Sequence, residues 1–356
     1  MDISKIDKNM VKNEEVYTTD DKDIYTIPHV KFDLYGVFYD AQDCTFRRID
    51  KEAASKAGIG VNFLHKCTAG GRIRFRTNST LFSVHVKYLG MSPGDNMSEI
   101  ARSGVILLEE RIDGSFWTQM VTRLSIDPKE NISSCNLSGE MKNYILYLPN
   151  YNTITELKIG LSKGAKVEGG KKYKDILPIL YYGSSITQGG CAARADASYQ
   201  AIISKWNNID FINLGFSGSA TAQPSVVEYM CGIDCSLFVM DYDYNAPNAD
   251  YLEKTHYPLY ESFRKTHPNT PILMVSKPDM ENEHQEEERQ KVIKASYRRA
   301  RRSGDKNVYF YNGKNFFNID NREICTVDRC HPNTLGMYLM AKKLYAKMKK
   351  ISKDFI

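Results

Sequence analysis

Residues 177–190 read LPILYYGSSITQGG and place two adjacent serines directly after a short apolar run. An apolar run of this length is typical of a buried strand. In an open α/β sheet, the side chains that follow a strand lie at its carboxyl end, where ligands bind. We therefore predict that Ser185 is a nucleophile. Taken alone, the stretch also fits a serine that only caps a helix.

A histidine near the end of the chain could activate this serine, since a serine hydroxyl is a poor nucleophile until a base takes its proton. An unperturbed imidazole, with a pKa of about 6.5, can act as that base near neutrality. His331 precedes Pro332, which disfavours helix at the preceding residue and leaves the histidine on a loop. Asp328 stands close before it and could orient the imidazole. The alternatives are a structural histidine and an aspartate that caps the last helix.

The tetrahedral intermediate of ester hydrolysis needs hydrogen-bond donors for its oxyanion. The backbone N–H groups of Ser185 and Gly218 and the side-chain amide of Asn245 are candidates. A glycine at position 218 would also let the substrate approach the backbone closely. Asn245 could instead serve only the backbone of its own loop. Together these residue types indicate acyl transfer through a serine.

Apolar runs alternate with helical patterns from residue 176 to the end of the chain. The expected strands are 177–182, 210–214, 236–240, 271–276 and 308–311. The expected helices are 197–206, 224–231, 251–266, 281–302 and 334–351. This alternation predicts a parallel sheet covered by helices on both faces, in a three-layer α/β/α domain. The loops after its first three strands, which carry the serine, glycine and asparagine, would meet at one edge of the sheet.

Residues 29–163 have a different pattern, without long helical periodicity. Gly71–Arg76 and Leu81–Tyr88 alternate apolar and polar side chains with a period of two, which is typical of strands. Further candidate strands are 105–112, 144–148 and 156–161. We predict an all-β sandwich with a jelly-roll-like topology. Residues 1–28 are expected to be a polar lead-in, and the Gly/Lys-rich residues 164–175 a linker.

Four sequence blocks in the C-terminal half resemble, in the same order, those of the SGNH (GDSL-type) hydrolases. They are GSSITQG at 183–189, NLGFSG at 213–218, DYN at 243–245 and DRCHPN at 328–333. The resemblance covers residues 176–356 and implies a flavodoxin-like fold and ester hydrolysis without a cofactor. It also implies that Ser185 is the nucleophile, His331 the base and Asp328 the acid that orients it. Gly218 and Asn245 would donate to the oxyanion.

The resemblance extends to the N-terminal half and has two departures. Phe32–Tyr35 (FDLY) resembles a motif of the β-sandwich domain that precedes some SGNH esterases. Ser184 stands where the first block of the family has aspartate, and Asp243 where the third block has glycine. Asp243 would place a negative charge near the oxyanion. Asp243 and Arg194 are candidate substrate-binding residues, and a surface ion pair is the alternative for Arg194.

Composition and charge exclude several classes of protein. The 356 residues carry a net charge of +5 that is spread along the chain, which argues against a nucleic-acid partner. The basic cluster at 288–302 lies toward the end of an expected helix, where cations are favoured. No long apolar run indicates a membrane span or a signal peptide. We expect a cytoplasmic protein, or a secreted one if a leader precedes this chain. The oligomeric state stays open.

Cysteines and acids give no sign of a metal site. The eight cysteines form no CxxC pair, so reduced thiols are the simplest interpretation. Asp241 and Asp243 have no histidine or cysteine at ligand spacing, and we expect neither a metal nor a cofactor.

The sequence predicts a serine esterase that removes small acyl groups, with acetyl favoured, from an O-acylated carbohydrate. The carbohydrate preference follows from the resemblance. The alternatives are a lipase, thioesterase or acyltransferase that uses another acyl donor, and a non-catalytic carbohydrate-binding protein.

Overall fold

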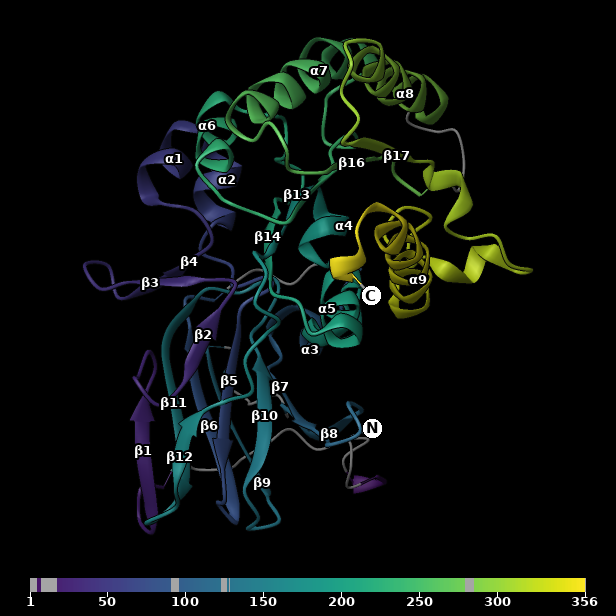
Figure 1. The fold of residues 1–356 in the computed structure, drawn as a ribbon. Coiled ribbons are helices and arrows are strands. Elements are labelled where there is room, and N and C mark those ends of the chain that lie inside the picture. Colours follow the sequence, from purple (N-terminus) through teal and green to yellow (C-terminus); the bar gives the residue numbers. More distant parts are fainter. Residues whose placement is uncertain are drawn as a thin grey trace.

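Two regions make up the fold, a β-sandwich and an α/β domain that packs against one end of it (Figure 1). The computed structural model describes residues 5–7, 18–90, 96–122, 127, 129–278 and 285–355. None of the helices in these ranges is long and apolar enough to cross a lipid bilayer.

Two antiparallel sheets form the sandwich. One has the order β1-β11-β6-β9, with the strands Lys22–Thr26, Ile154–Ser162, Leu81–Tyr88 and Glu130–Asn136. The other has the order β12-β5-β10-β7-β8, with the strands Val167–Gly169, Arg72–Thr77, Lys142–Tyr147, Ile106–Glu110 and Phe116–Val121. Side chains from both sheets, among them Phe75, Phe82 and Leu157, share one buried apolar core. The predicted sandwich is confirmed.

The sandwich extends beyond the expected range of 29–163. Strand β1 lies within the expected lead-in and pairs with β11, and β12 lies within the expected linker and pairs with β5. Both are short polar strands held by backbone hydrogen bonds, which the alternation of side chains does not reveal. Three further strands complete the described part of this region. β2 (Asp33–Tyr35) pairs with β5, and β3 (Phe38–Asp40) forms a hairpin with β4 (Thr45–Arg47).

Five parallel strands form the central sheet of the α/β domain. Their order is β14-β13-β15-β16-β17, with the bounds Phe211–Gly215, Ile179–Gly183, Leu237–Asp241, Ile272–Val275 and Val308–Tyr311. In chain order this is the 2-1-3-4-5 arrangement of flavodoxin-like folds. The predicted fold class is therefore confirmed.

Helices cover both faces of this sheet (Figure 1). One face carries α6 (Pro224–Cys231), α7 (Ala249–Thr266) and α8 (Glu286–Arg302), and the other carries α5 (Tyr199–Asn207) and α9 (Thr334–Ile351). Residues 281–284, predicted as the start of α8, lie outside the described residues. On β13, Leu180 and Tyr182 enter the first core while Ile179 and Tyr181 enter the second, which explains why this strand is apolar throughout.

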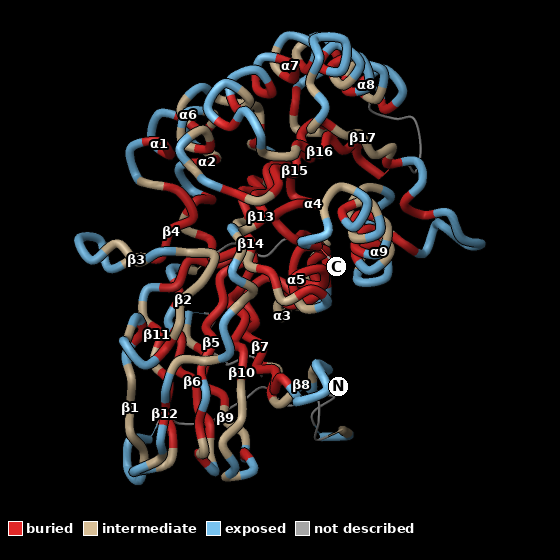
Figure 2. The backbone as a smooth tube through the Cα atoms, viewed as in Figure 1, coloured by how far each residue is buried: buried red, intermediate tan, exposed pale blue. Residues whose placement is uncertain are grey.

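An apolar interface joins the two regions, and Figure 2 shows buried backbone running through their junction. Leu108 and Tyr147 of the sandwich belong to the same buried cluster as α5 and α9. Two short helices that the sequence did not predict, α1 (Lys51–Lys56) and α2 (Ile59–Leu64), pack into the cluster that contains α6 and α7. The N-terminal region therefore contributes to both cores of the α/β domain.

Strand β5 alternates as predicted, but its polar face is not exposed to water. Ile73 and Phe75 enter the sandwich core, whereas Arg72 and Arg74 are buried on the other face, toward the α/β domain. There Arg72 forms an ion pair with Asp210. The alternation indicates the strand, and the neighbouring domain decides what its polar face contacts.

Arg48 is a buried cation that links the N-terminal region to β14. Its guanidinium donates hydrogen bonds to four backbone carbonyl oxygens, those of Leu64 (2.7 Å), Cys67 (2.8 Å), Asn213 (3.0 Å) and Gly215 (2.5 Å). It also lies over the ring of Phe216, 4.7 Å from the ring centre. Burial lowers the pKa of Arg48 to about 10, so the group remains charged at neutral pH.

We expect Arg48→Met to lower the free energy of unfolding by at least about 3 kcal/mol, because several buried carbonyl groups would lose their donor. Urea unfolding measures this loss. Lys51→Met is the matched control, since Lys51 is an exposed cation on the same segment, and its effect is expected to stay within about 0.5 kcal/mol. Equal, small losses in both variants would contradict the structural role of Arg48.

Candidate active site

The two adjacent serines have different roles in the local structure. Strand β13 ends at Gly183, and Ser184 is the N-cap of helix α4 (Ser185–Gln188). The Ser184 hydroxyl accepts a hydrogen bond from the N–H of Ile186 at 3.2 Å. Ser185 is therefore the first helical residue, and its hydroxyl is not the cap.

Buried hydrogen bonds from both regions hold the backbone around Ser185. The hydroxyls of Thr187 and Tyr199 each donate to the Asp241 carboxylate at 2.9 Å. Burial raises the pKa of Asp241 to about 7. From the N-terminal region, the hydroxyl of Tyr151 donates to the carbonyl oxygen of Ser185 at 3.2 Å. Helix α4 is thus fixed to the parallel sheet and to the sandwich.

His331 lies on the predicted loop immediately before α9. The N–H of Val327 donates to the His331 carbonyl at 3.0 Å and closes the loop. Asn333 caps α9, since its side chain accepts two N–H groups of the first turn. Asp328 is therefore not the cap of this helix.

Ser185, His331 and Asp328 form one connected set of hydrogen bonds. The Ser185 Oγ and His331 Nε2 are 2.8 Å apart, and the His331 Nδ1 and Asp328 Oδ2 are 2.7 Å apart. The other carboxylate oxygen of Asp328 accepts the backbone N–H of His331 at 2.7 Å. This arrangement can hold the imidazole in the tautomer that accepts a proton from the serine.

Neighbouring groups shift the pKa values of both Asp328 and His331. Burial alone would raise the pKa of Asp328, but hydrogen bonds from the His331 N–H and from Asn96 outweigh it and hold this pKa well below its usual range. Burial alone would lower the pKa of His331, but contacts with Cys330 and then with Asp328 outweigh it and raise this pKa above 6.5. Asp328 is therefore ionised at neutral pH, and a substantial share of His331 is protonated.

We expect the raised pKa of His331 to appear in the pH profile of kcat/KM. A protonated imidazole cannot take the proton of Ser185, so activity is lost as the pH falls through the pKa of His331. The midpoint of this limb is expected above 6.5, and Cys330→Ala should move it to lower pH, because the contact with Cys330 raises the pKa. Rates from pH 5 to pH 10 measure it. A midpoint in the wild type below about 6.5 would contradict the expectation.

The three candidate oxyanion donors lie at one edge of the sheet. Strand β13 lies between β14 and β15, so the loops with Gly218 and Asn245 flank that of Ser185. Gly218 has φ +63°, a left-handed conformation that favours glycine. The amide oxygen of Asn245 accepts the N–H of Ala220 at 3.3 Å, which leaves its NH2 group as the donor end. The N–H of Ser185, in the first turn of α4, has no partner within the helix.

Arg194 forms an ion pair, as in the alternative interpretation of the sequence. Its guanidinium donates two hydrogen bonds of 3.0 Å to the carboxylate of Asp196. It also donates to the hydroxyl of Thr118 on β8 at 3.3 Å. These contacts account for the side chain as an ion pair, and substrate binding by Arg194 stays a prediction.

Asp243 is buried and has a structural environment. Its carboxylate accepts the backbone N–H of Lys277 at 2.8 Å, and its carbonyl oxygen accepts the guanidinium of Arg289 at 2.6 Å. Only 4% of the residue is exposed. The carboxylate of Asp243 holds the segment after β16, and substrate contact by this residue stays a prediction.

Two residues beside the acid and the base were missed in the sequence. Asn96, from the sandwich region, donates from its side-chain amide to Asp328 Oδ2 at 2.8 Å. Cys330, interpreted as an ordinary thiol, contacts His331, and although burial raises its pKa, the contacts with His331 and Tyr244 outweigh burial and lower it. Only Cys330 offered a signal, its position next to His331 in the sequence.

Comparison with known proteins finds a family match for each of the two regions. Residues 177–349 match the GDSL-like lipase/acylhydrolase family. The C-terminal domain belongs to the GDSL-like lipase/acylhydrolase family. Residues 24–167 match the N-terminal domain of SGNH-hydrolase-type esterases. No curated protein matches the sequence.

Solved structures share both regions of this GDSL-like enzyme. A GDSL-like lipase from Bacteroides ovatus is 28% identical, with a TM-score of 0.82 over 92% of this chain and 98% of that one. A salicylyl-acyltransferase from a tetracycline biosynthetic pathway is 18% identical, with a TM-score of 0.77 over 93% and 98%. An acetyl xylan esterase from the rumen bacterium Butyrivibrio proteoclasticus is 13% identical, with a TM-score of 0.58 over 94% and 100%. At these low identities, the similarity to the acyltransferase and to the acetyl xylan esterase shows a shared fold.

Among the residues that the structure describes, one group in the GDSL-like domain has the composition of a possible metal site. A thiol, a carboxylate and an imidazole, those of Cys191, Asp328 and His331, lie within 4.8 Å of one another. The carboxylate and the imidazole are hydrogen-bonded to each other, and the thiol donates to the Asn96 carbonyl at 3.3 Å. These partners account for the three groups, so we assign them no metal. All eight cysteines are free thiols.

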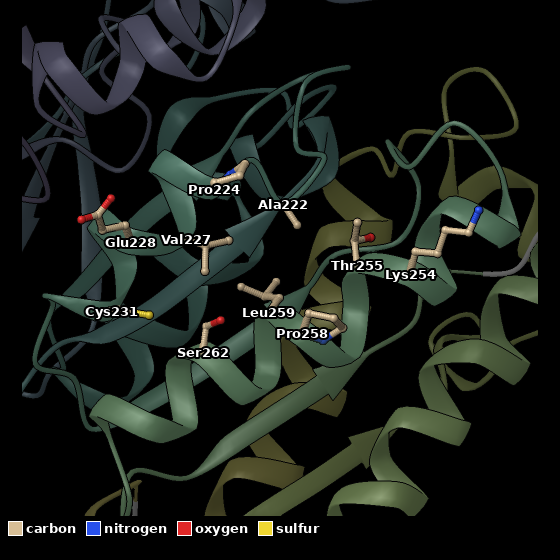
Figure 3. Close-up of a pocket in the computed structure, with 10 residues that line it drawn as sticks. All are labelled: Ala222, Pro224, Val227, Glu228, Cys231, Lys254, Thr255, Pro258, Leu259 and Ser262. Carbon is tan, nitrogen blue, oxygen red and sulfur yellow. The ribbon is translucent and has the colours of Figure 1, made fainter.

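A separate groove of about 440 Å³ lies between α6 and α7 and is shown in Figure 3. Val227, Pro258 and Leu259 give it an apolar floor, and Glu228 and Lys254 lie at its sides. Neither Ser185 nor His331 lines it. We therefore place the candidate active site at the loops of the sheet edge and not in this groove.

Proposed function

We propose that this enzyme is a serine esterase that removes small acyl groups, acetyl above all, from oxygen atoms of a carbohydrate. The observation that carries the proposal is the hydrogen-bonded series from Ser185 through His331 to Asp328, with 2.8 Å and 2.7 Å between the paired atoms. A hydroxyl, an imidazole and a carboxylate in this order are the parts that acyl transfer through a serine needs.

In the proposed first step, Ser185 Oγ attacks the carbonyl carbon of the ester while His331 Nε2 takes the hydroxyl proton. The N–H groups of Ser185 and Gly218 and the amide of Asn245 donate to the oxyanion that forms. When the intermediate collapses, the bond to the sugar oxygen breaks, and His331 returns its proton to that oxygen. The acyl group remains on Ser185.

In the second step, water attacks the acyl-serine and His331 takes a proton from the water. The bond between the acyl group and Ser185 Oγ then breaks, and His331 returns the proton to the serine. The products are a carboxylic acid and the free enzyme. Asp328 stays ionised throughout and stabilises the imidazolium that forms in each step.

The choice of substrate class rests on likeness in fold. A family two carbohydrate esterase from Clostridium thermocellum, solved with cellohexaose, has a TM-score of 0.56 at 14% identity. The acetyl xylan esterase is alike across both regions. A small acyl group attached to a sugar is the substrate that these two proteins suggest.

A second candidate function is acyl transfer to an alcohol other than water, favoured by the TM-score of 0.77 to the salicylyl-acyltransferase. The first step would be the same, and an acceptor hydroxyl would replace water in the second. The two functions therefore differ only in what attacks the acyl-serine.

The test compares p-nitrophenyl acetate, butyrate and octanoate with a mixture of acetylated xylo-oligosaccharides, for wild type and Ser185→Ala. The proposal expects acetate to be released from the oligosaccharides and the rate to fall with acyl length. Turnover that rises toward octanoate would favour a lipase. Transfer of the acyl group to an added alcohol in place of free acid would favour the acyltransferase. Wild type that acts on none of these substrates would contradict the esterase proposal.

A further inference from the structure

Asn96 connects the sandwich region to the acid of the candidate active site. It lies shortly before helix α3 (Glu99–Ser103), far in sequence from the catalytic loops. Its side-chain Nδ2 donates to Asp328 Oδ2 at 2.8 Å. The same oxygen accepts the Nδ1–H of His331 at 2.7 Å. Asn96 and His331 thus share one acceptor, and their two nitrogens are 3.5 Å apart.

With Asn96 in place, the carboxylate of Asp328 has a full set of donors. Its Oδ1 accepts the backbone N–H groups of Cys330 at 3.1 Å and His331 at 2.7 Å. Its Oδ2 accepts His331 Nδ1 and Asn96 Nδ2. A carboxylate offers about four lone-pair sites, so Asn96 fills the last of them. Because the Asp328 side chain is 31% exposed, water would take this site if Asn96 were absent.

The backbone of Asn96 is hydrogen-bonded to the segment that follows the nucleophile. Its carbonyl oxygen accepts the thiol of Cys191 at 3.3 Å, and Cys191 follows helix α4 closely in the chain. Cys191 is buried and has φ +66°, an uncommon conformation for a residue other than glycine. One residue of the sandwich therefore contacts both the segment after Ser185 and the side chain of Asp328.

Hydrogen bonds hold the helix that follows Asn96 in place. Ser98 caps α3 through a hydrogen bond from the N–H of Ala101. The carbonyl of Arg102 in α3 accepts the N–H of Tyr151, whose hydroxyl in turn donates to the Ser185 carbonyl. Tyr151 therefore links the short helix after Asn96 to the backbone of Ser185.

We propose that Asn96 is a positioning residue, by which the sandwich domain fixes the orientation of Asp328 toward His331. This inference rests on the roles proposed above for His331 and Asp328. When His331 takes the proton of Ser185, the imidazolium needs Oδ2 in line with its Nδ1–H. The amide of Asn96 holds Oδ2 in that direction. The sandwich domain then takes part in catalysis through the acid, whether or not it contacts the substrate.

Two variants distinguish donation by Asn96 from simple packing. Asn96→Ala removes the donor and is expected to lower kcat on p-nitrophenyl acetate by about 10- to 100-fold, with KM nearly unchanged, as for a hydrogen bond to a charged group. Asn96→Asp keeps the size of the side chain but replaces the donor by an acceptor beside Asp328. It is therefore expected to be slower than Asn96→Ala at neutral pH. Asn136→Ala, at an exposed asparagine of β9, is the matched control.

A second measurement does not depend on turnover. The low-field proton resonance of the His331 Nδ1–H, identified by its loss in Asp328→Asn, reports the bond to Oδ2. We expect it to shift or broaden in both Asn96 variants and to stay unchanged in Asn136→Ala, with thermal unfolding showing that each variant is folded. If wild type were inactive, the proposed function would fail while this resonance still tested Asn96. An unchanged resonance, or an Asn96→Asp variant as fast as wild type, would overturn the proposal.

Discussion

Ser185→Ala is expected to reduce ester hydrolysis by on the order of 10⁴-fold or more, because no other group would form the acyl intermediate. The Ser185 hydroxyl is the one paired with His331 Nε2, at 2.8 Å. Its removal leaves the fold intact, since the cap of α4 is provided by Ser184. Initial rates on p-nitrophenyl acetate at equal protein concentration measure the loss.

The adjacent serine provides the matched control. Ser184→Ala removes the cap of α4 and is expected to cost about 0.5–2 kcal/mol of stability while turnover stays measurable. A fluorophosphonate probe should label Ser185 in wild type and in Ser184→Ala, and mass spectrometry of the peptide identifies the modified serine. Labelling of Ser184 would mean that Ser184 and not Ser185 is the nucleophile. Activity that survives in Ser185→Ala and is lost in Ser184→Ala would mean the same.

Asp328→Asn is expected to lower kcat by on the order of 10³- to 10⁴-fold through the tautomer of His331. The amide oxygen can still accept the backbone N–H groups of residues 330 and 331, so the turn is kept. The amide nitrogen then faces His331 Nδ1 and donates to it. The imidazole must carry its proton on Nε2, where it can no longer accept the proton of Ser185. The new amide nitrogen would also face the NH2 group of Asn96.

The control for this variant is Asp320→Asn, at an exposed acid earlier in the same connection to α9. It loses the same charge without touching His331, and its kcat is expected to stay close to that of wild type. Steady-state kinetics on one batch of each protein are sufficient. A loss of less than about 10-fold in Asp328→Asn would mean that His331 is oriented by another group.

The strands of the α/β domain and the order of its site loops could be predicted from the sequence, because the signals are local. A buried parallel strand is apolar throughout, and β13 shows this pattern because side chains on both of its faces enter a core. His331 could be placed on a loop because a proline follows it. Asp328 lies on the same turn as His331, so their proximity did not depend on the rest of the fold.

Other features depend on contacts between distant segments, which the local pattern does not encode. Arg72 and Arg74 alternate with apolar residues as on an exposed face, yet the α/β domain buries them. Asp243 stands where the family has glycine, and only the position of Lys277 shows that its carboxylate is used by the backbone. The short helices α1 and α2 have too few turns to give a periodic signal, and their apolar side chains find a partner only in the core around α6.

The sequence by itself therefore predicted Ser185, His331 and Asp328 as nucleophile, base and acid, since each is marked by a strand end or a turn within a few residues of it. The tertiary structure showed that Ser184 caps α4 and that the hydroxyl of Ser185 is paired with His331. It also brought Asn96 to Asp328 across 232 residues of sequence. An asparagine shortly before a short helix has no local signature of such a contact. The contact of Asn96 with Asp328 forms only because the sandwich and the α/β domain pack against each other.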